Sequence, residues 1–317
     1  MRSPLHHSTV CCLLPFVLLS VSGHASSGVE KGEWTLSRSV VPDHLKFSII
    51  SSDADGRYFN SSSDWSVQEF RGLDWSPAAK HDVHFTISRD AGTLECEGFV
   101  QSGAGAGLFN FRPNEHYAKQ MAALGFSGVN VERQFALALH DVSLEFARQI
   151  KAEGIADADL EKLIAFRIHG VSPQFIKEIR AAGVKVDESE KLIAFRIHGV
   201  SPEFVKRLNA AGIHELDNEK LIAFRIHGVS PEFVRELQAA GVGVSDSEKL
   251  IAFRIHGVTP EFVSQLAHLG YAKPDPDKLV ALRIHGVTPE YIESLRSHGV
   301  HNLTLDQLIS LRIHGIN

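Results

Sequence analysis

Cysteine is scarce in this chain of 317 residues, which contains three in all. Cys11 and Cys12 fall within an apolar segment near the N-terminus, so Cys96 is the one cysteine of the remaining sequence. A lone cysteine cannot form an intrachain disulfide, even in a compartment that would permit one. We therefore expect the fold to be stabilised by packing.

Excess positive charge and long apolar runs are lacking as well. The formal net charge is -6, whereas general affinity for nucleic acid usually needs a basic face. Past the N-terminal segment, no stretch approaches the ~18 consecutive apolar residues that suggest a transmembrane helix. The sequence therefore predicts neither a nucleic-acid partner nor a membrane span in the mature chain.

The first 25 residues have the pattern of a secretory signal peptide. Arg2 supplies a positive start, residues 11–21 form a short apolar core, and residues 22–25 offer small side chains for cleavage. The core is too short to cross a bilayer. We expect cleavage after residue 25 and an exported protein, periplasmic or secreted, with a retained anchor as the alternative.

Residues 28–112 are predicted to form a small antiparallel β domain. Apolar and polar residues alternate over 44–49 and 82–88, as in half-buried strands. A turn at 89–92 leads into a return strand over 93–100, with a bulge expected at Gly98. Shorter segments near 33–36, 58–65 and 108–111 bring the total to five to seven strands, in a sandwich or barrel.

Two features of this region could be mistaken for sites. The glycine-rich run 103–107 lacks the third glycine and the following helix of a dinucleotide-binding loop, so we interpret it as hairpin or flat strand. The three tryptophans Trp34, Trp65 and Trp75 all lie here. We expect them to fill the core; exposed together, they would instead form an aromatic surface that binds carbohydrate or peptide.

A 29-residue repeat organises residues 113–317. The motif Phe166-Arg167-Ile168-His169-Gly170-Val171 recurs with few changes, and a second glycine, first seen at Gly125, recurs in the same register. Such periods indicate stacked structural units. The sequence predicts an α-solenoid of about seven αα-hairpins, whose motif histidines are at 169, 198, 227, 256, 285 and 314.

Capping signals divide each unit into two short helices. In one copy Asp246 is an N-cap and Gly257 the left-handed residue past the C-terminus, and Ser172-Pro173 opens a second helix in another. Residues 304–307 make a capping box. The first helix is apolar almost all round and is expected to be a buried inner layer; the second varies between copies and is expected to face solvent.

The repeated arginine and histidine form a ladder that we interpret as an internal clasp. A buried arginine must be paired, and the candidate partners are acidic residues such as Glu190 and Glu203 or the helix-end carbonyls of the next unit. Histidine would cap carbonyls near the helix C-terminus. The ladder consists of Arg167, His169, Arg196, His198, Arg225, His227, Arg254, His256, Arg283, His285, Arg312 and His314.

Two other interpretations of the ladder were weighed. Zinc needs several ligands around one ion, and one histidine per stacked unit does not converge on a common point, which disfavours a metal ladder. An exposed stripe of arginine and histidine could instead bind an acidic partner or a glycan. The clasp interpretation is preferred.

Motifs of catalysis are missing from the sequence. It contains no His-Glu-x-x-His, Gly-x-Ser-x-Gly, P-loop or Cys-x-x-Cys pattern. We predict a protein without a cofactor that is not an enzyme, and whose repeat surface binds another protein or a cell-envelope component. The alternative is an enzyme with a site in the β domain or at its junction with the repeats.

The pattern Leu-Ile-Ala-Phe-Arg-Ile-His-Gly-Val-Ser/Thr-Pro-Glu-Phe, with the turn at 89–92 and the strands over 103–111, resembles a family of exported bacterial proteins. It is also similar to the extracytoplasmic region attached to some BlaR-type sensor metallopeptidases. The resemblance covers residues 30–317 and implies a sensing or interaction module. The peptidase zinc motif and membrane helices are absent, so it implies no peptidase activity.

Overall fold

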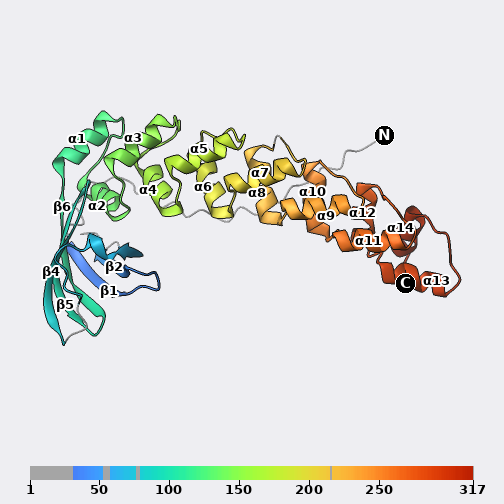
Figure 1. Cartoon of the computed structure of the whole chain (residues 1–317), viewed down its shortest axis with the longest axis horizontal. Coiled ribbons are helices and arrows are strands. Elements are labelled where there is room, and N and C mark those ends of the chain that lie inside the picture. Colours follow the sequence, from blue (N-terminus) through green and yellow to red (C-terminus); the bar gives the residue numbers. More distant parts are fainter. Residues whose placement is uncertain (1–30, 53–57, 76–78, 215, 317) are drawn as a thin grey trace.

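A computed structural model describes residues 31–52, 58–75, 79–214 and 216–316. The predicted signal peptide, residues 1–25, lies outside the described residues. A β-sheet occupies one end of the molecule, and a long array of paired helices extends away from it (Figure 1). None of the described helices is long and apolar enough to cross a membrane.

The described part of the N-terminal region contains a single six-stranded antiparallel sheet. Its order is β3-β2-β1-β6-β5-β4, so β1 and β6, from opposite ends of the region, meet in the middle. This arrangement is neither a sandwich nor a closed barrel. The strands are β1 (Lys31–Arg38), β2 (His44–Ser52), β3 (Tyr58–Ser66), β4 (His81–Arg89), β5 (Gly92–Gln101) and β6 (Ala104–Pro113).

Alternation along the strands places large apolar side chains on one face, and the sheet curves around them. The rings of Trp34 on β1 and Phe85 on β4 lie 5.0 Å apart, although β6 and β5 separate these strands in the sheet. Phe70, from the short 3-10 helix region after β3, fills the space between Phe47 and Phe85. The curvature gives this small region a core on one side.

The glycine-rich run belongs to β6 and is not a phosphate loop. A Cβ on Gly98 would come within 2.7 Å of the Trp34 ring, and one on Gly105 within 3.1 Å. The glycines therefore make room for the indole, whose Nε1–H donates to the carbonyl of Leu108 at 3.0 Å. The bulge expected at Gly98 is wrong, because pairing with β4 continues through this residue without a shift.

The helices form two layers, as expected for stacked αα-hairpins. We call each even-numbered helix, together with the odd-numbered helix that follows it, a unit. The even-numbered helix is the first helix of the unit and the odd-numbered helix is the second. First helices pack against the first helices of neighbouring units, and second helices pack against second helices. The first helices are α2 (Val131–Leu139), α4 (Leu160–His169), α6 (Ser189–His198), α8 (Asn218–His227), α10 (Ser247–His256), α12 (Pro276–Ile284) and α14 (Leu305–Ile313). The odd-numbered helices are α1 (Glu115–Ala123), α3 (Leu144–Ala152), α5 (Pro173–Ala181), α7 (Pro202–Ala210), α9 (Pro231–Ala239), α11 (Pro260–His268) and α13 (Pro289–Ser297).

Helix ends occur where the capping residues predict them. The Asp246 side chain accepts from backbone N–H groups at the start of α10, and Gly257 adopts the left-handed conformation at its end. Ser172 caps α5, with proline as the first helical residue. The capping box of Thr304 and Gln307 is formed in α14.

The sheet and the array share a continuous core. Phe135 of α2 packs against Phe59, Phe109 and Phe111 of the sheet. The buried Gln134 amide donates to the carbonyls of Ala91 and Asn114, both at 2.6 Å. The first unit is therefore fixed to the end of the sheet by apolar packing and by hydrogen bonds to its backbone.

The array twists along its length. Near the sheet the odd-numbered helices lie above the even-numbered ones in Figure 1, and at the far end they lie below them. A row of equivalent residues on the first helices therefore follows a twisted path.

Candidate binding surface

The repeated arginine links each unit to the unit before it. The Nε–H of Arg225 donates to the main-chain carbonyl of His198 at 3.1 Å, and its guanidinium carbon lies 4.9 Å from the centre of the Phe204 ring. The carbonyl is one of those left without a partner at the end of α6. Arg225 thus caps one helix of the preceding unit and covers the first turn of the other.

The same contacts recur along the array. The hydrogen bonds are Arg167 to His140 at 3.1 Å, Arg196 to His169 at 3.3 Å, Arg254 to His227 at 3.4 Å and Arg283 to His256 at 3.3 Å. The corresponding rings are Phe146, Phe175, Phe233 and Phe262, with Tyr291 below Arg312.

The motif glycine gives the arginine its space. Gly199 has a φ of 73°, which favours glycine, and a Cβ there would lie 2.8 Å from Nη2 of Arg225. By contrast Gly212, at the end of the second helix, has a φ of 85° with nothing near its Cβ position. The motif glycine therefore serves both the backbone turn and the clasp.

The clasp differs from the prediction in two respects. Arg225 is exposed, not buried; its partner is a helix-end carbonyl, as one of the two alternatives predicted, but of the preceding unit, and the acid Glu190 pairs with Lys162. Histidine supplies its main-chain carbonyl as the acceptor. In the described structure its ring caps a carbonyl only at His314, which lies 2.7 Å from the Ser310 oxygen. The predicted capping role of the other ladder histidine rings is wrong.

A row of isoleucines lies exposed beside the ladder. We call this the isoleucine row; it occupies the last turns of the first helices. Its exposure contradicts the expectation that these helices form a fully buried inner layer, since side chains such as Leu163 and Phe166 are buried while the isoleucine between the arginine and the histidine of the motif is exposed. The row comprises Ile168 (56% exposed), Ile197 (46%), Ile226 (57%), Ile255 (57%), Ile284 (55%) and Ile313 (57%).

Ion pairs join neighbouring units at the other end of the first helices. Lys162, near the start of α4, pairs with Glu190 near the start of α6, with Nζ and Oε1 2.9 Å apart. The same pairing links each first helix to the next. Further pairs join Lys191 to Glu219, Lys220 to Glu248, Lys249 to Asp277 and Lys278 to Asp306.

A second clasp, which the sequence analysis missed, joins the second helices. Arg180 donates to the carbonyl of Glu153 at 2.8 Å, and Gln238 to that of Ala211 at 2.9 Å. Both acceptors lie at the end of the preceding second helix. Lys151, Asn209 and Arg296 occupy the same repeat position and bond the carbonyls of Leu124, Ala182 and Leu269.

The first unit carries a different residue at the glycine position. Asp141 stands where the other units have glycine, and it adopts a left-handed φ of 51°. Its carboxylate forms a hydrogen-bonded ion pair with Nη2 of Arg167, while Nε of the same arginine keeps its bond to the carbonyl of His140. A carboxylate can therefore occupy the outer edge of a ladder arginine without breaking the clasp.

Arg89 of the sheet caps the same helix end. Its Nη1 donates to the carbonyls of Ala138 and Leu139 at 2.8 Å, its guanidinium lies 3.8 Å from the centre of the Trp65 ring, and Glu69 pairs with Nη2 at 2.5 Å. Leu139, the counterpart of the row isoleucines, is 5% exposed. The row position is therefore covered in the unit that packs against the sheet.

The tryptophans do not form an exposed platform. Trp34 and Trp65 are buried in the core of the sheet, and the partly buried Trp75 packs against this core. The expectation that the tryptophans fill the core is therefore confirmed for Trp34 and Trp65, and the alternative of an aromatic binding surface is wrong for these two.

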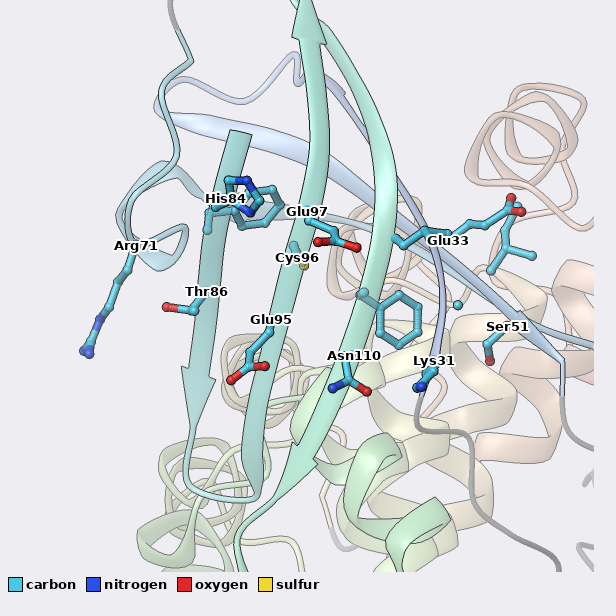
Figure 2. A pocket seen from close by; sticks show the side chains of 15 residues that line it. Lys31, Glu33, Ser51, Arg71, His84, Thr86, Glu95, Cys96, Glu97 and Asn110 are labelled. Atoms are coloured by element: carbon cyan, nitrogen blue, oxygen red, sulfur yellow. The ribbon is translucent and has the colours of Figure 1, made fainter. Parts of the chain in front are cut away.

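A shallow depression of about 920 Å³ lies over the sheet. Figure 2 shows His84 of β4 beside Glu97 of β5, with Glu95 further along β5 and Arg71 extending away from them. His84 and Glu97 are cross-strand neighbours, which accounts for their proximity. The arrangement matches the polar face of a sheet.

Shifted pKa values occur in the sheet and at its junction with the array, where burial raises the pKa of the Tyr117 hydroxyl. Burial lowers the pKa of His140, with smaller contributions from Arg89 and Arg167. The pKa of exposed His81 is raised, mainly by hydrogen bonds to the carbonyls of Ala79 and Asp74. Burial raises the pKa of the Cys96 thiol, which leaves it protonated and unreactive.

No group of side chains suited to holding a metal ion occurs among the described residues. No protein-family model matches the chain, and a search of curated proteins gives no match either. The resemblance to exported bacterial repeat proteins therefore stays a prediction, and the argument for function depends on the surface itself.

Proposed function

We propose that this chain is a non-catalytic exported protein that binds an elongated partner, another protein or a component of the cell envelope, along the isoleucine row. The observation that carries the proposal is the repeated exposure of one large aliphatic side chain per unit. Exposed apolar residues scattered singly need no explanation, but an aligned series of them is typical of an interaction surface.

Sequence variation between units at other exposed positions supports a binding role for the isoleucine row. An equally exposed position on the second helices is Glu178, Arg207, Glu236, Gln265 and Ser294 in successive units. The row remains isoleucine in six successive units. Substitution has therefore changed solvent-facing positions between copies while leaving isoleucine in place, and packing within the array does not require an exposed side chain.

The first unit supports the same proposal from another direction. Leu139 occupies the row position there and is buried where the sheet packs against α2. The row position can thus be covered by a folded surface, as it is within this chain. An external partner would continue this coverage along the later units.

A photo-crosslinking amino acid placed at Ile226 of the full chain tests the proposal. Irradiation in the cells that export the protein should give a discrete crosslinked product, which mass spectrometry identifies. The same amino acid at Glu236, on the second-helix layer of the same unit, is the matched control. A product from Glu236 alone, or products of equal yield from both, would place the binding surface elsewhere.

A further inference from the structure

We propose that the ladder arginines Arg196, Arg225, Arg254 and Arg283 each bind a carboxylate of one extended acidic peptide segment, whose aliphatic side chains lie on the isoleucine row. This inference rests on the proposed function and names the chemistry of the partner. It follows from the first unit, where the chain supplies a carboxylate of its own.

Asp141 shows where such a carboxylate fits. It reaches Nη2 of Arg167 from the glycine position, while Nε of Arg167 remains on the carbonyl of the preceding helix end. In the later units glycine replaces this aspartate, so no side chain occupies the equivalent place. The backbone and the clasp are otherwise equivalent, and the edge of the guanidinium that Asp141 covers is open.

The later arginines retain unused donors. Arginine has five N–H groups in a planar fork, and at Arg196, Arg225 and Arg254 only Nε is engaged in a hydrogen bond in the described structure. None of these three, nor Arg283, takes part in an ion pair with a described residue, and all four are exposed. Guanidinium and carboxylate are matched in geometry and charge.

The charge pattern of this face favours an anionic partner. Near the helix starts, each lysine is paired with an acid, as Lys162 is with Glu190, and N-cap acids such as Asp217 add negative charge. Near the helix ends, Arg196, Arg225 and Arg254 form no ion pair with a described acid, and the charge of Arg283 helps to lower the pKa of the Glu290 carboxyl. The positive charge of this face is therefore concentrated at the helix ends, in a row adjacent to the isoleucines.

The distance between successive ladder arginines favours an extended peptide as the partner. Packed helices lie about 8–10 Å apart, so successive arginines are separated by a similar distance. A polyproline II segment rises ~9.3 Å in each three-residue turn. A carboxylate at every third residue would therefore meet successive arginines, and the residues between would reach the isoleucines. An extended chain can also follow the twist of the array, which a straight partner helix cannot.

Synthetic fluorescent peptides test this with the full chain. The probe is a 15-residue peptide of Glu-Pro-Val triplets, and anisotropy measures its binding. We expect it to bind at least ten-fold more tightly than a peptide of the same composition with glutamates clustered at one end. A heptad-spaced acidic helical peptide, or a polyuronate oligosaccharide, that bound equally well would overturn the proposal.

Variants that carry aspartate at the glycine position, as the first unit does at Asp141, give a direct control. Gly199→Asp with Gly228→Asp places internal carboxylates beside Arg225 and Arg254 and should weaken the probe at least ten-fold. Gly199→Asn with Gly228→Asn has the same shape and tolerance of left-handed backbone but no charge, and it should lose much less probe binding than the aspartate variant. Circular dichroism verifies that both fold.

The outcomes separate this inference from the proposed function. Failure of the probe to bind, with a discrete crosslink at Ile226, would overturn the acidic-peptide inference while the binding surface stands. Equal loss of binding in the Asp and Asn variants would also overturn it, because shape rather than charge would then be responsible. Absence of both the crosslink and probe binding would overturn both proposals.

Discussion

The Nε–H of Arg225 donates to the carbonyl oxygen of His198, which lies 27 residues earlier in the chain, at 3.1 Å. One side chain from each unit thus completes the hydrogen bonding of a helix in the unit before it.

Replacing Arg225 with alanine should lower the free energy of unfolding by ~1–2 kcal/mol, since it removes a hydrogen bond and a cation–π contact at an exposed site. A buried, paired arginine would cost more. Urea unfolding followed by circular dichroism measures the change. Arg235→Ala, which removes an exposed ion pair with Glu232, serves as the control and should cost about 0.5 kcal/mol or less.

Gly199→Ala should be more destabilising than Gly212→Ala. Both place a Cβ on left-handed backbone, which costs roughly 1–2 kcal/mol, but only at Gly199 does the Cβ meet a guanidinium. In an Arg225→Ala background the two substitutions should cost the same. A difference that persisted there would show that the arginine is not its cause.

Ala267→Gln should stabilise the array by about 0.5–1.5 kcal/mol. Ala267 occupies the position at which Gln238 and Arg296 cap the preceding helix, and alanine has no donor for this purpose. Ala267→Glu, which is similar in size but cannot donate when ionised, is the matched control. Equal melting temperatures for the Gln and Glu variants would contradict the capping role.

Ile226→Ala should change the free energy of unfolding by about 0.5 kcal/mol or less, as is usual at the surface. Leu221→Ala, in the buried part of the same helix, should cost ~2–5 kcal/mol. Both values come from the same denaturation measurement. A large loss at Ile226 would mean that the row supports the fold and would remove the main argument for a binding surface.

Acidification should destabilise the chain partly through His140. Its pKa is lowered in the folded state, so below the unfolded value of about 6.5 the unfolded chain binds the proton more readily. The stabilising effect of the neutral ring is present above that pH and is lost as pH falls through the folded pKa. Melting curves between pH 7.5 and 5 should therefore depend less on pH in His140→Gln. Parallel pH dependences would contradict this assignment.

Local structure could be predicted from the sequence because the signals for helix ends and strands lie within a few residues of one another. Asp246, Ser172 and Thr304 act as helix caps, and alternation within 44–49 and 82–88 gives strands. The predicted α+β arrangement of a β region followed by helical repeats is confirmed.

Exposure on the first helices was harder to predict. A helix with Leu163, Ile164, Ala165, Phe166 and Ile168 offers no polar stripe from which to judge its orientation. Stacking on both sides buries Leu163 and Phe166 and leaves Ile168 outside. The second clasp was missed because its donors differ in type, although Lys151, Arg180, Asn209 and Gln238 share one repeat position and all carry N–H donors.

The direction of the two clasps also bears on how the chain is assembled. In both, the donor belongs to the later unit and the acceptor to the earlier one, 27 residues before it. During synthesis the sheet emerges first, and each new unit can close the open helix ends of the unit already folded. Folding can then proceed in the order of translation, with each step waiting for one repeat of new chain.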